Sequence, residues 1–115
     1  MLAETIKGAR AVYTVVYAIY PKDGMSATDF RTHLTEVHSE IGKRLPKVRS
    51  YEQYPIVSAE GELGPEVGAF AIIKFDSEAD FEIAGASAAM QEAIADAPNY
   101  ASHFAAYVVD VNALI

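Results

Sequence analysis

The sequence has no cysteine, and its 9 lysine and arginine residues are outnumbered by 16 aspartate and glutamate residues. Without cysteine the chain can form no disulfide, no thiolate zinc site and no cysteine nucleophile. A formal net charge of -7 disfavours partners that require a positive surface, such as nucleic acids and anionic membranes. The chemistry that remains is that of oxygen and imidazole groups, and we expect a small, mostly uncharged organic ligand.

Long hydrophobic runs are also missing. No segment approaches the roughly 20 consecutive apolar residues that a membrane span requires. Residues 1–10, MLAETIKGAR, contain an acidic residue and no apolar stretch of the kind found in secretory signals. We therefore expect a soluble, cytoplasmic protein. Its 115 residues, 51% of them hydrophobic, predict a single domain over residues 1–115.

Six secondary-structure elements can be predicted from the sequence pattern. Runs rich in Val, Ile, Tyr and Phe are typical of strands, and turn residues such as Pro and Gly separate them. Two further segments have apolar residues at helical spacing, each preceded by a serine suited to the N-cap. The expected strands are residues 11–20, 48–57, 69–75 and 103–115, and the expected helices are residues 27–44 and 78–97.

Each predicted helix is expected to be continuous. Ser26 and Ser77 are the predicted N-caps, while Pro46 and Pro98 follow the predicted ends. The apolar side of the first helix is predicted to hold Phe30, Leu34, Val37 and Ile41. That of the second is predicted to hold Ala79, Ile83, Ala86, Met90, Ala93 and Ala97. Phe81 lies opposite this second stripe, so it is exposed, caps a pocket, or shows that the helix boundary differs.

The order βαββαβ predicts an α+β, ferredoxin-like fold, in which two helices cover one face of a four-stranded antiparallel sheet. Both faces of the first and the last predicted strands are nevertheless apolar, as in the first strand, where Tyr13, Val15, Tyr17 and Ile19 alternate with Val12, Val16, Ala18 and Tyr20. A sheet face left in water should instead carry polar side chains. We therefore expect a second copy of the chain to cover this face in a homodimer.

The segment KDGMSATDFRTHLTEVHSEIGKRLPKVRSY, together with the strand before it and the later FDSEADF at residues 75–81, resembles the EthD-like family of the dimeric α+β barrel superfamily. The resemblance spans nearly the whole chain. The most specific matches are Phe30, the E-V-H at residues 36–38, the L-P at residues 45–46, and Tyr51. The resemblance implies two sheets paired face to face in a dimer, with a pocket between each sheet and its own helices. It also implies oxidative degradation of small organic molecules such as fuel ethers, often under the label of reductase. Related barrels include cofactor-free monooxygenases, lactone isomerases and haem-binding proteins.

The two histidines of the first predicted helix raise the question of a shared site. On a regular α-helix His33 and His38 are about 140° apart, so they are not predicted to bind one metal. Each borders the apolar stripe, where an ordinary half-buried histidine is the plain interpretation. The E-V-H resemblance implies a ligand-contacting or proton-transferring role for His38 alone. His33 keeps the ordinary interpretation, and His103 is predicted to be a strand-end residue.

Tyr51 is the second candidate site residue, because its phenol could hydrogen-bond a substrate oxygen; simple packing in the sheet is the alternative. Tyr13 and Tyr17 share a strand face that lines either the pocket or the dimer barrel. Glu36 points away from His38, which leaves that histidine without a predicted carboxylate partner. A basic run of Lys43, Arg44, Lys47 and Arg49 is typical of a helix C-terminus, and less typical of an anion site.

Two functions remain open at this point. The first is an enzyme, an oxidoreductase by resemblance, with His38 as acid or base and Tyr51 orienting a small apolar substrate. The second is a non-catalytic ligand carrier or an accessory protein for an oxygenase, which the missing carboxylate partner favours. A haem-binding barrel is a weaker third interpretation. No nucleotide- or phosphate-binding motif is visible, so no cofactor is predicted, and the histidine spacing predicts no metal.

Overall fold

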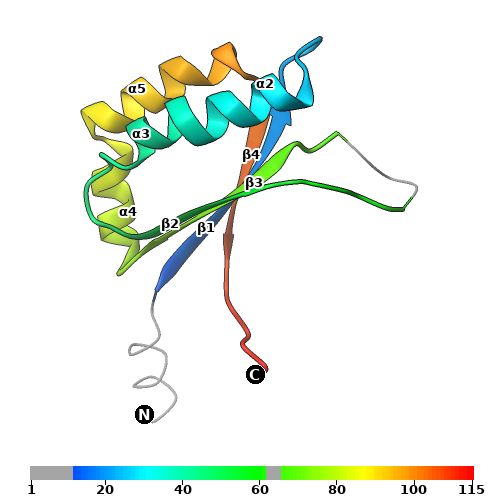
Figure 1. The fold of residues 1–115 in the computed structure, drawn as a ribbon. Coiled ribbons are helices and arrows are strands. Elements are labelled where there is room, and N and C mark those ends of the chain that lie inside the picture. Colours follow the sequence, from blue (N-terminus) through cyan, green and yellow to red (C-terminus); the bar gives the residue numbers. More distant parts are fainter. Residues whose placement is uncertain (1–11, 62–65) are drawn as a thin grey trace, which may run out of the picture.

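A computed structural model describes residues 12–61 and 66–115. Its four strands are β1 (Tyr13–Pro21), β2 (Val48–Pro55), β3 (Ala69–Phe75) and β4 (Ala101–Val109). They form one sheet in the order β2-β3-β1-β4, with every neighbouring pair antiparallel. The helices lie together on one face of this sheet (Figure 1). The predicted α+β, ferredoxin-like fold is confirmed.

The strand ends differ slightly from the predicted ones. β4 begins at Ala101, two residues early, because Pro21 at the end of β1 pairs with it. It ends at Val109, since Val109 pairs with Thr14 and β1 begins only one residue before Thr14. β2 ends at Pro55. The predicted first strand included residue 11, which lies outside the described part of the chain.

The first helical segment is not a regular α-helix. It consists of α2 (Ala27–Thr32), the π-helical turn η1 (His33–His38) and α3 (Ser39–Gly42). The predicted N-cap is confirmed, because the Ser26 hydroxyl accepts a 3.0 Å hydrogen bond from the Asp29 amide. Within η1 the hydrogen bonds span five residues, as in the bond from the Ser39 amide to the Leu34 carbonyl. The wider turn changes which residues face the sheet, and Val37, predicted to be buried, is 45% exposed.

The second helical segment is broken, and the prediction of one continuous helix was wrong. It comprises α4 (Glu78–Gly85), α5 (Ala88–Asp96) and the 3-10 turn η2 (Ala97–Asn99). Ser77 caps α4 as predicted, but Ser87 starts a new helix by accepting a hydrogen bond from the Met90 amide. Figure 1 shows that α4 turns away from the direction of α5 at one end of the sheet. The predicted apolar stripe is therefore interrupted, and Ile83 is exposed.

The helix-covered face of the sheet contains the core. Its fully buried side chains include Val15, Leu34 and Phe75. Tyr13 and Tyr17 both belong to this face, which resolves their open placement. Phe81 on α4 packs against the rings of Tyr13 and Phe75, with centroids 5.2 and 5.5 Å away. Its predicted position opposite the apolar stripe resulted from treating α4 and α5 as one continuous helix.

Among residues 12–61 and 66–115, no helix covers the opposite face of the sheet, here called the outer face (Figure 1). Strand pairing places Val16, Ile72 and Tyr107 side by side on it. Tyr54, Phe70 and Tyr107 are among its exposed large hydrophobic residues. Among the described residues, no helix is long and apolar enough to cross a membrane.

Candidate active site

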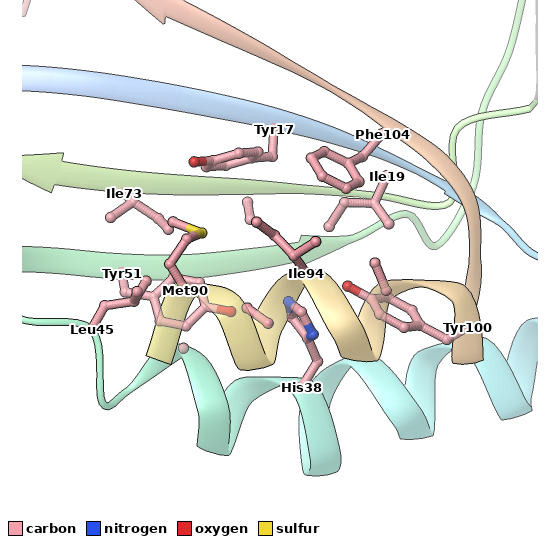
Figure 2. Close-up of a pocket in the computed structure, with 14 residues that line it drawn as sticks. Tyr17, Ile19, His38, Leu45, Tyr51, Ile73, Met90, Ile94, Tyr100 and Phe104 are labelled. Carbon is pink, nitrogen blue, oxygen red and sulfur yellow. The ribbon is translucent and has the colours of Figure 1, made fainter. Parts of the chain in front are cut away.

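A cavity of about 80 Å³ lies between the sheet and the helices α3 and α5 (Figure 2). All four strands or their ends, together with both helical segments, contribute to its wall. The lining is Tyr17, Ile19, His38, Gly42, Leu45, Tyr51, Ala71, Ile73, Met90, Ala93, Ile94, Ala97, Tyr100 and Phe104. It is mainly apolar, with one imidazole and three phenols as its polar groups. Both predicted site residues, His38 and Tyr51, are in contact with this cavity, while their roles stay predictions.

His38 has a carboxylate partner that the sequence did not reveal. Its Nδ1 lies 2.8 Å from Oδ2 of Asp96, the last residue of α5. Because an ionised carboxylate only accepts hydrogen bonds, Nδ1 carries the proton in this contact. In the neutral imidazole the lone pair is then on Nε2, the other ring nitrogen. The ring thus combines an oriented Nδ1–H with a basic nitrogen available to a ligand in the cavity.

His33 reaches the same carboxylate, with its Nε2 2.9 and 3.0 Å from the two Asp96 oxygens. The two histidines therefore do not point 140° apart, as a regular α-helix would place them. The π-helical turn brings residues five positions apart to a similar side of the helix. The separation predicted from α-helical geometry was wrong for this reason, and the absence of a carboxylate partner was wrong with it.

Asp96 is 8% exposed and accepts hydrogen bonds from three side chains. The third is the Asn99 amide, 3.0 Å from Oδ1. Burial alone would raise the pKa of Asp96, but the hydrogen bonds from Asn99, His38 and His33 outweigh it and lower that pKa. The carboxylate is therefore ionised at neutral pH. One sequence signal pointed to it: an aspartate in the last turn of a helix opposes the helix dipole and needs a compensating partner.

Tyr100 fixes the two imidazole rings in place. Its ring stacks on His33 at a centroid distance of 4.9 Å and an interplanar angle of 18°. It meets the His38 ring at 5.0 Å and the Phe30 ring at 5.7 Å. Tyr100 is 2% exposed, and its hydroxyl faces the cavity beside His38 in Figure 2. Tyr100 was not predicted as a site residue, because it follows the helix end and precedes β4 without any recognisable motif.

Tyr51 is held from two sides. The Gln53 side-chain amide donates one hydrogen bond to the Leu34 carbonyl at 3.0 Å and one to the Tyr51 hydroxyl at 2.9 Å. On the other side Gly42 allows close approach, since a Cβ there would lie 2.6 Å from Cε2 of the Tyr51 ring. The ring forms a wall between the cavity and a wider surface hollow of about 510 Å³ bordered by α3 and β2.

The three phenols of the cavity are neutral hydrogen-bonding groups. Burial raises the pKa of Tyr17, Tyr51 and Tyr100. The charge that Tyr51 would carry as an anion further raises the pKa of both Tyr17 and Tyr100, because the three hydroxyls face a common space. Among the described residues, the Tyr17 and Tyr100 hydroxyls have no side-chain or backbone hydrogen-bond partner, and neither is fully enclosed by protein.

The remaining predicted candidates lie away from the cavity. His103 stacks on Tyr20 with ring centroids 4.1 Å apart, on the outer face of the sheet. Three of the four residues of the basic run form exposed ion pairs: Lys43 with Glu40, Arg44 with Glu92 and Arg49 with Asp76. These contacts fit the interpretation of a cationic helix end, and exposed pairs of this kind contribute little to stability.

Metal and haem sites can be tested against this geometry. Within the described ranges, no group of three or more His, Asp or Glu side chains is arranged to hold a metal ion. A cavity of about 80 Å³ is also far smaller than the roughly 300–1,000 Å³ pockets that hold drug-sized ligands. The haem macrocycle therefore does not fit the cavity as it stands.

The geometry agrees with the result of comparing the chain with known protein families. The EthD domain matches residues 22–103. This segment contains His33, His38 and Asp96, together with two of the three tyrosines of the cavity, Tyr51 and Tyr100. The chain belongs to the EthD family. This match confirms the resemblance seen in the E-V-H segment and at Tyr51. Among curated proteins, none matches this sequence.

Solved structures share the fold at low sequence identity. An ethyl tert-butyl ether D (EthD) family protein from Bacillus halodurans superposes with a TM-score of 0.72 at 16% identity, covering 87% of this chain and 99% of that protein. A dimeric ferredoxin-like protein of unknown function from Thermobifida fusca gives 0.63 at 15% identity, covering 87% and 91%. A protein from Bacteroides thetaiotaomicron, named as a proposed antibiotic biosynthesis monooxygenase, gives 0.59 at 12% identity, covering 93% of each chain.

Proposed function

We propose that this EthD-family protein is an enzyme that transfers a proton to or from a small, largely apolar organic molecule, with His38 as the acid or base. The observation that carries the proposal is the 2.8 Å contact between His38 Nδ1 and the buried Asp96 carboxylate. A carboxylate in this position fixes the tautomer and orientation of the imidazole. The second ring nitrogen then exchanges protons with a molecule in the cavity.

The cavity lining supports an apolar substrate. Its wall is formed mainly by aliphatic side chains, and no lysine or arginine of the described part of the chain contributes to it. Ile94 and Phe104 line the cavity and are still 51% and 46% exposed, so the opening lies between α5 and β4. A substrate larger than the cavity would place its reactive end beside His38 and extend its apolar remainder between these two side chains.

An oxidative role in catabolism is the finer form of this proposal. It is supported by the EthD family itself and by the monooxygenase name of the Bacteroides thetaiotaomicron protein. Acid–base groups alone do not oxidise a substrate, so such a route takes an oxidant such as molecular oxygen. Proton removal by His38 would produce the electron-rich anion with which an oxidant reacts.

We further propose that the working form is a homodimer in which the outer faces of two sheets meet. The apolar row of Val16, Ile72 and Tyr107 has no cover within the described chain. The Thermobifida fusca protein with the same fold is described as dimeric. A second copy supplies a matching apolar surface through two-fold symmetry.

The test is substrate consumption by the purified protein. Small ketones, phenols and lactones are supplied singly, and their loss is followed by gas chromatography together with dissolved oxygen. His38→Gln should reduce turnover by about 10²–10⁴-fold, the usual contribution of a general acid or base. His103→Gln, the same change outside the cavity, should leave it unchanged. Turnover that survives His38→Gln would contradict the assignment.

A non-catalytic carrier is the second candidate, favoured by the predominantly aliphatic wall of the cavity. It predicts that the wild-type protein binds one of these compounds and consumes none. Native mass spectrometry of the freshly purified protein, which detects a co-purified ligand, addresses this candidate directly. Binding without consumption across the whole set would favour the carrier over the enzyme.

A further inference from the structure

We propose that the cavity takes a small neutral carbonyl compound, whose oxygen is held by the phenols of Tyr51, Tyr17 and Tyr100 while its α-carbon lies beside His38. This inference rests on the proposed proton transfer and names the substrate class for it. It follows from the direction of the hydrogen bonds around Tyr51 and from the lack of a lysine or arginine among the described residues that line the cavity.

The hydrogen-bond direction at Tyr51 is set by β2 and η1. The Leu34 carbonyl can only accept, so the group of Gln53 that contacts it is the NH₂ group. The second hydrogen of the same NH₂ group is directed at the Tyr51 oxygen. Tyr51 therefore acts as an acceptor toward Gln53, and its own O–H remains available for a ligand in the cavity.

Two more phenols reinforce this donor group. Tyr17 and Tyr100 line the same cavity, and neither hydroxyl has a hydrogen-bond partner among the described residues. In Figure 2 the oxygens of Tyr51 and Tyr100 lie on either side of the His38 ring, with Tyr17 across the cavity on β1. A ligand oxygen in this space can accept hydrogen bonds from phenols, while the neighbouring carbon faces the imidazole.

The charges of the site favour a neutral ligand over an anionic one. Asp96 already places a carboxylate behind the two histidines, and among the described residues no lysine or arginine lines the cavity. A second carboxylate would be buried without a dedicated cation, which is costly. A hydrocarbon would give the tyrosine hydroxyls of the wall no hydrogen-bond acceptor, whereas a carbonyl oxygen accepts hydrogen bonds from them. A neutral ketone or aldehyde meets both conditions.

The chemical step is enolisation, which is balanced without any further reactant. Nε2 of His38 takes the α-hydrogen as a proton, and the electron pair of the broken C–H bond forms a C=C bond. The carbonyl π electrons move onto oxygen, where the phenolic O–H groups stabilise the developing negative charge. The proton returns from His38 to the same carbon or to another position, which gives exchange or isomerisation.

The experiment compares two ligands of the same shape, cyclopentanone and methylenecyclopentane, which differ by C=O against C=CH₂. Binding is followed by NMR chemical-shift titration of the full chain. Cyclopentanone should bind about fivefold more tightly, because one net hydrogen bond contributes on the order of 1 kcal/mol. Tyr51→Phe should remove most of this preference, and Tyr17→Phe should reduce it.

Tyr13→Phe is the matched control, since Tyr13 lies on the same strand face as Tyr17 but packs on Phe81 outside the cavity. It should leave the preference unchanged. Equal affinity for the two ligands, or a preference that survives Tyr51→Phe in a folded variant, would overturn the carbonyl assignment.

Exchange of the α-hydrogens of cyclopentanone in D₂O separates this inference from the proposed function. The wild-type protein should accelerate the exchange, and His38→Gln should abolish the acceleration. If the carbonyl compound is preferred through Tyr51 but exchange is not accelerated, the proton-transfer role of His38 fails and the ligand assignment stands. If neither is found, both fail.

Discussion

The two faces of the sheet use similar residues for different purposes. On the helix-covered face Tyr17, Tyr51 and Tyr100 surround a cavity, where Gln53 donates a hydrogen bond to Tyr51 and the His38 ring packs against Tyr100. On the outer face Tyr107 is exposed beside Val16, and Tyr54 is exposed beside Phe70 and donates a hydrogen bond to Glu52. Aromatic content alone therefore does not identify the site. The difference comes from the histidines and the buried Asp96 carboxylate that the helices bring to one face.

The largest expected effect comes from placing a charge on the outer face. Ile72→Asp should raise the dissociation constant of the proposed homodimer by at least about 30-fold, because a buried interface position typically contributes 2 kcal/mol or more. Sedimentation velocity over a range of protein concentrations measures this. Val108→Asp is the matched control, since Val108 is also an exposed strand residue but belongs to the helix-covered face. Equal dissociation by the two variants would contradict a dimer built on the outer face.

The fold could be predicted from the sequence because it depends on patterns that repeat along the chain. Strand alternation and the caps Ser26 and Ser77 are local signals, and the structure confirms both. The helix break escaped prediction because Ser87 lies in an alanine-rich stretch, where serine is compatible with a continuous helix. The cap it provides becomes visible only in the Ser87 hydroxyl contact with the Met90 amide.

The candidate site was only half predictable, for a physical reason. His38 and Tyr51 could be named from the family resemblance, but Asp96 lies 58 residues from His38 in the chain. The contact also depends on the π-helical turn, whose wider geometry no spacing rule for α-helices anticipates. His38, Tyr51 and Asp96 come from η1, β2 and α5, and tertiary packing brings them together. The sequence of each element alone therefore gives only a weak signal for the site.

A smaller effect is expected from closing the space behind Tyr51. In Gly42→Ala the new Cβ would lie 2.6 Å from the Tyr51 ring, so the ring must shift. Overpacking of this kind costs about 1–3 kcal/mol, and it should also weaken ligand binding by displacing the hydroxyl. Thermal unfolding and ligand titration measure the two effects. Gly85→Ala is the control, because nothing lies within 4 Å of a Cβ at that position. If Gly42→Ala changed neither the stability nor the ligand affinity, the Tyr51 ring would be shown to move freely.

The smallest expected effect is a pH dependence that arises from Asp96 on the helix-covered face. Burial opposes its charge, yet hydrogen bonds from Asn99, His38 and His33 lower its pKa below the ordinary value of about 3.9. A carboxyl whose folded pKa is lowered stabilises the fold fully above its unfolded pKa, and this contribution is lost as the pH falls through the folded pKa. The free-energy difference of unfolding between wild type and Asp96→Asn should therefore be largest above about pH 4 and shrink below it.

The size of this change follows from the shift itself, because each unit by which the pKa of Asp96 is lowered corresponds to about 1.4 kcal/mol. Urea unfolding at a series of pH values gives the difference, and the carboxyl carbon shift of Asp96 in NMR gives the titration midpoint itself. Because His33 and His38 face the same oxygens, both readouts are repeated in His33→Gln, which removes one imidazole and should raise the Asp96 midpoint. A midpoint above about 4 in the wild-type protein would mean that the three hydrogen bonds do not outweigh burial, and the oriented imidazole of His38 would lose its ionised partner.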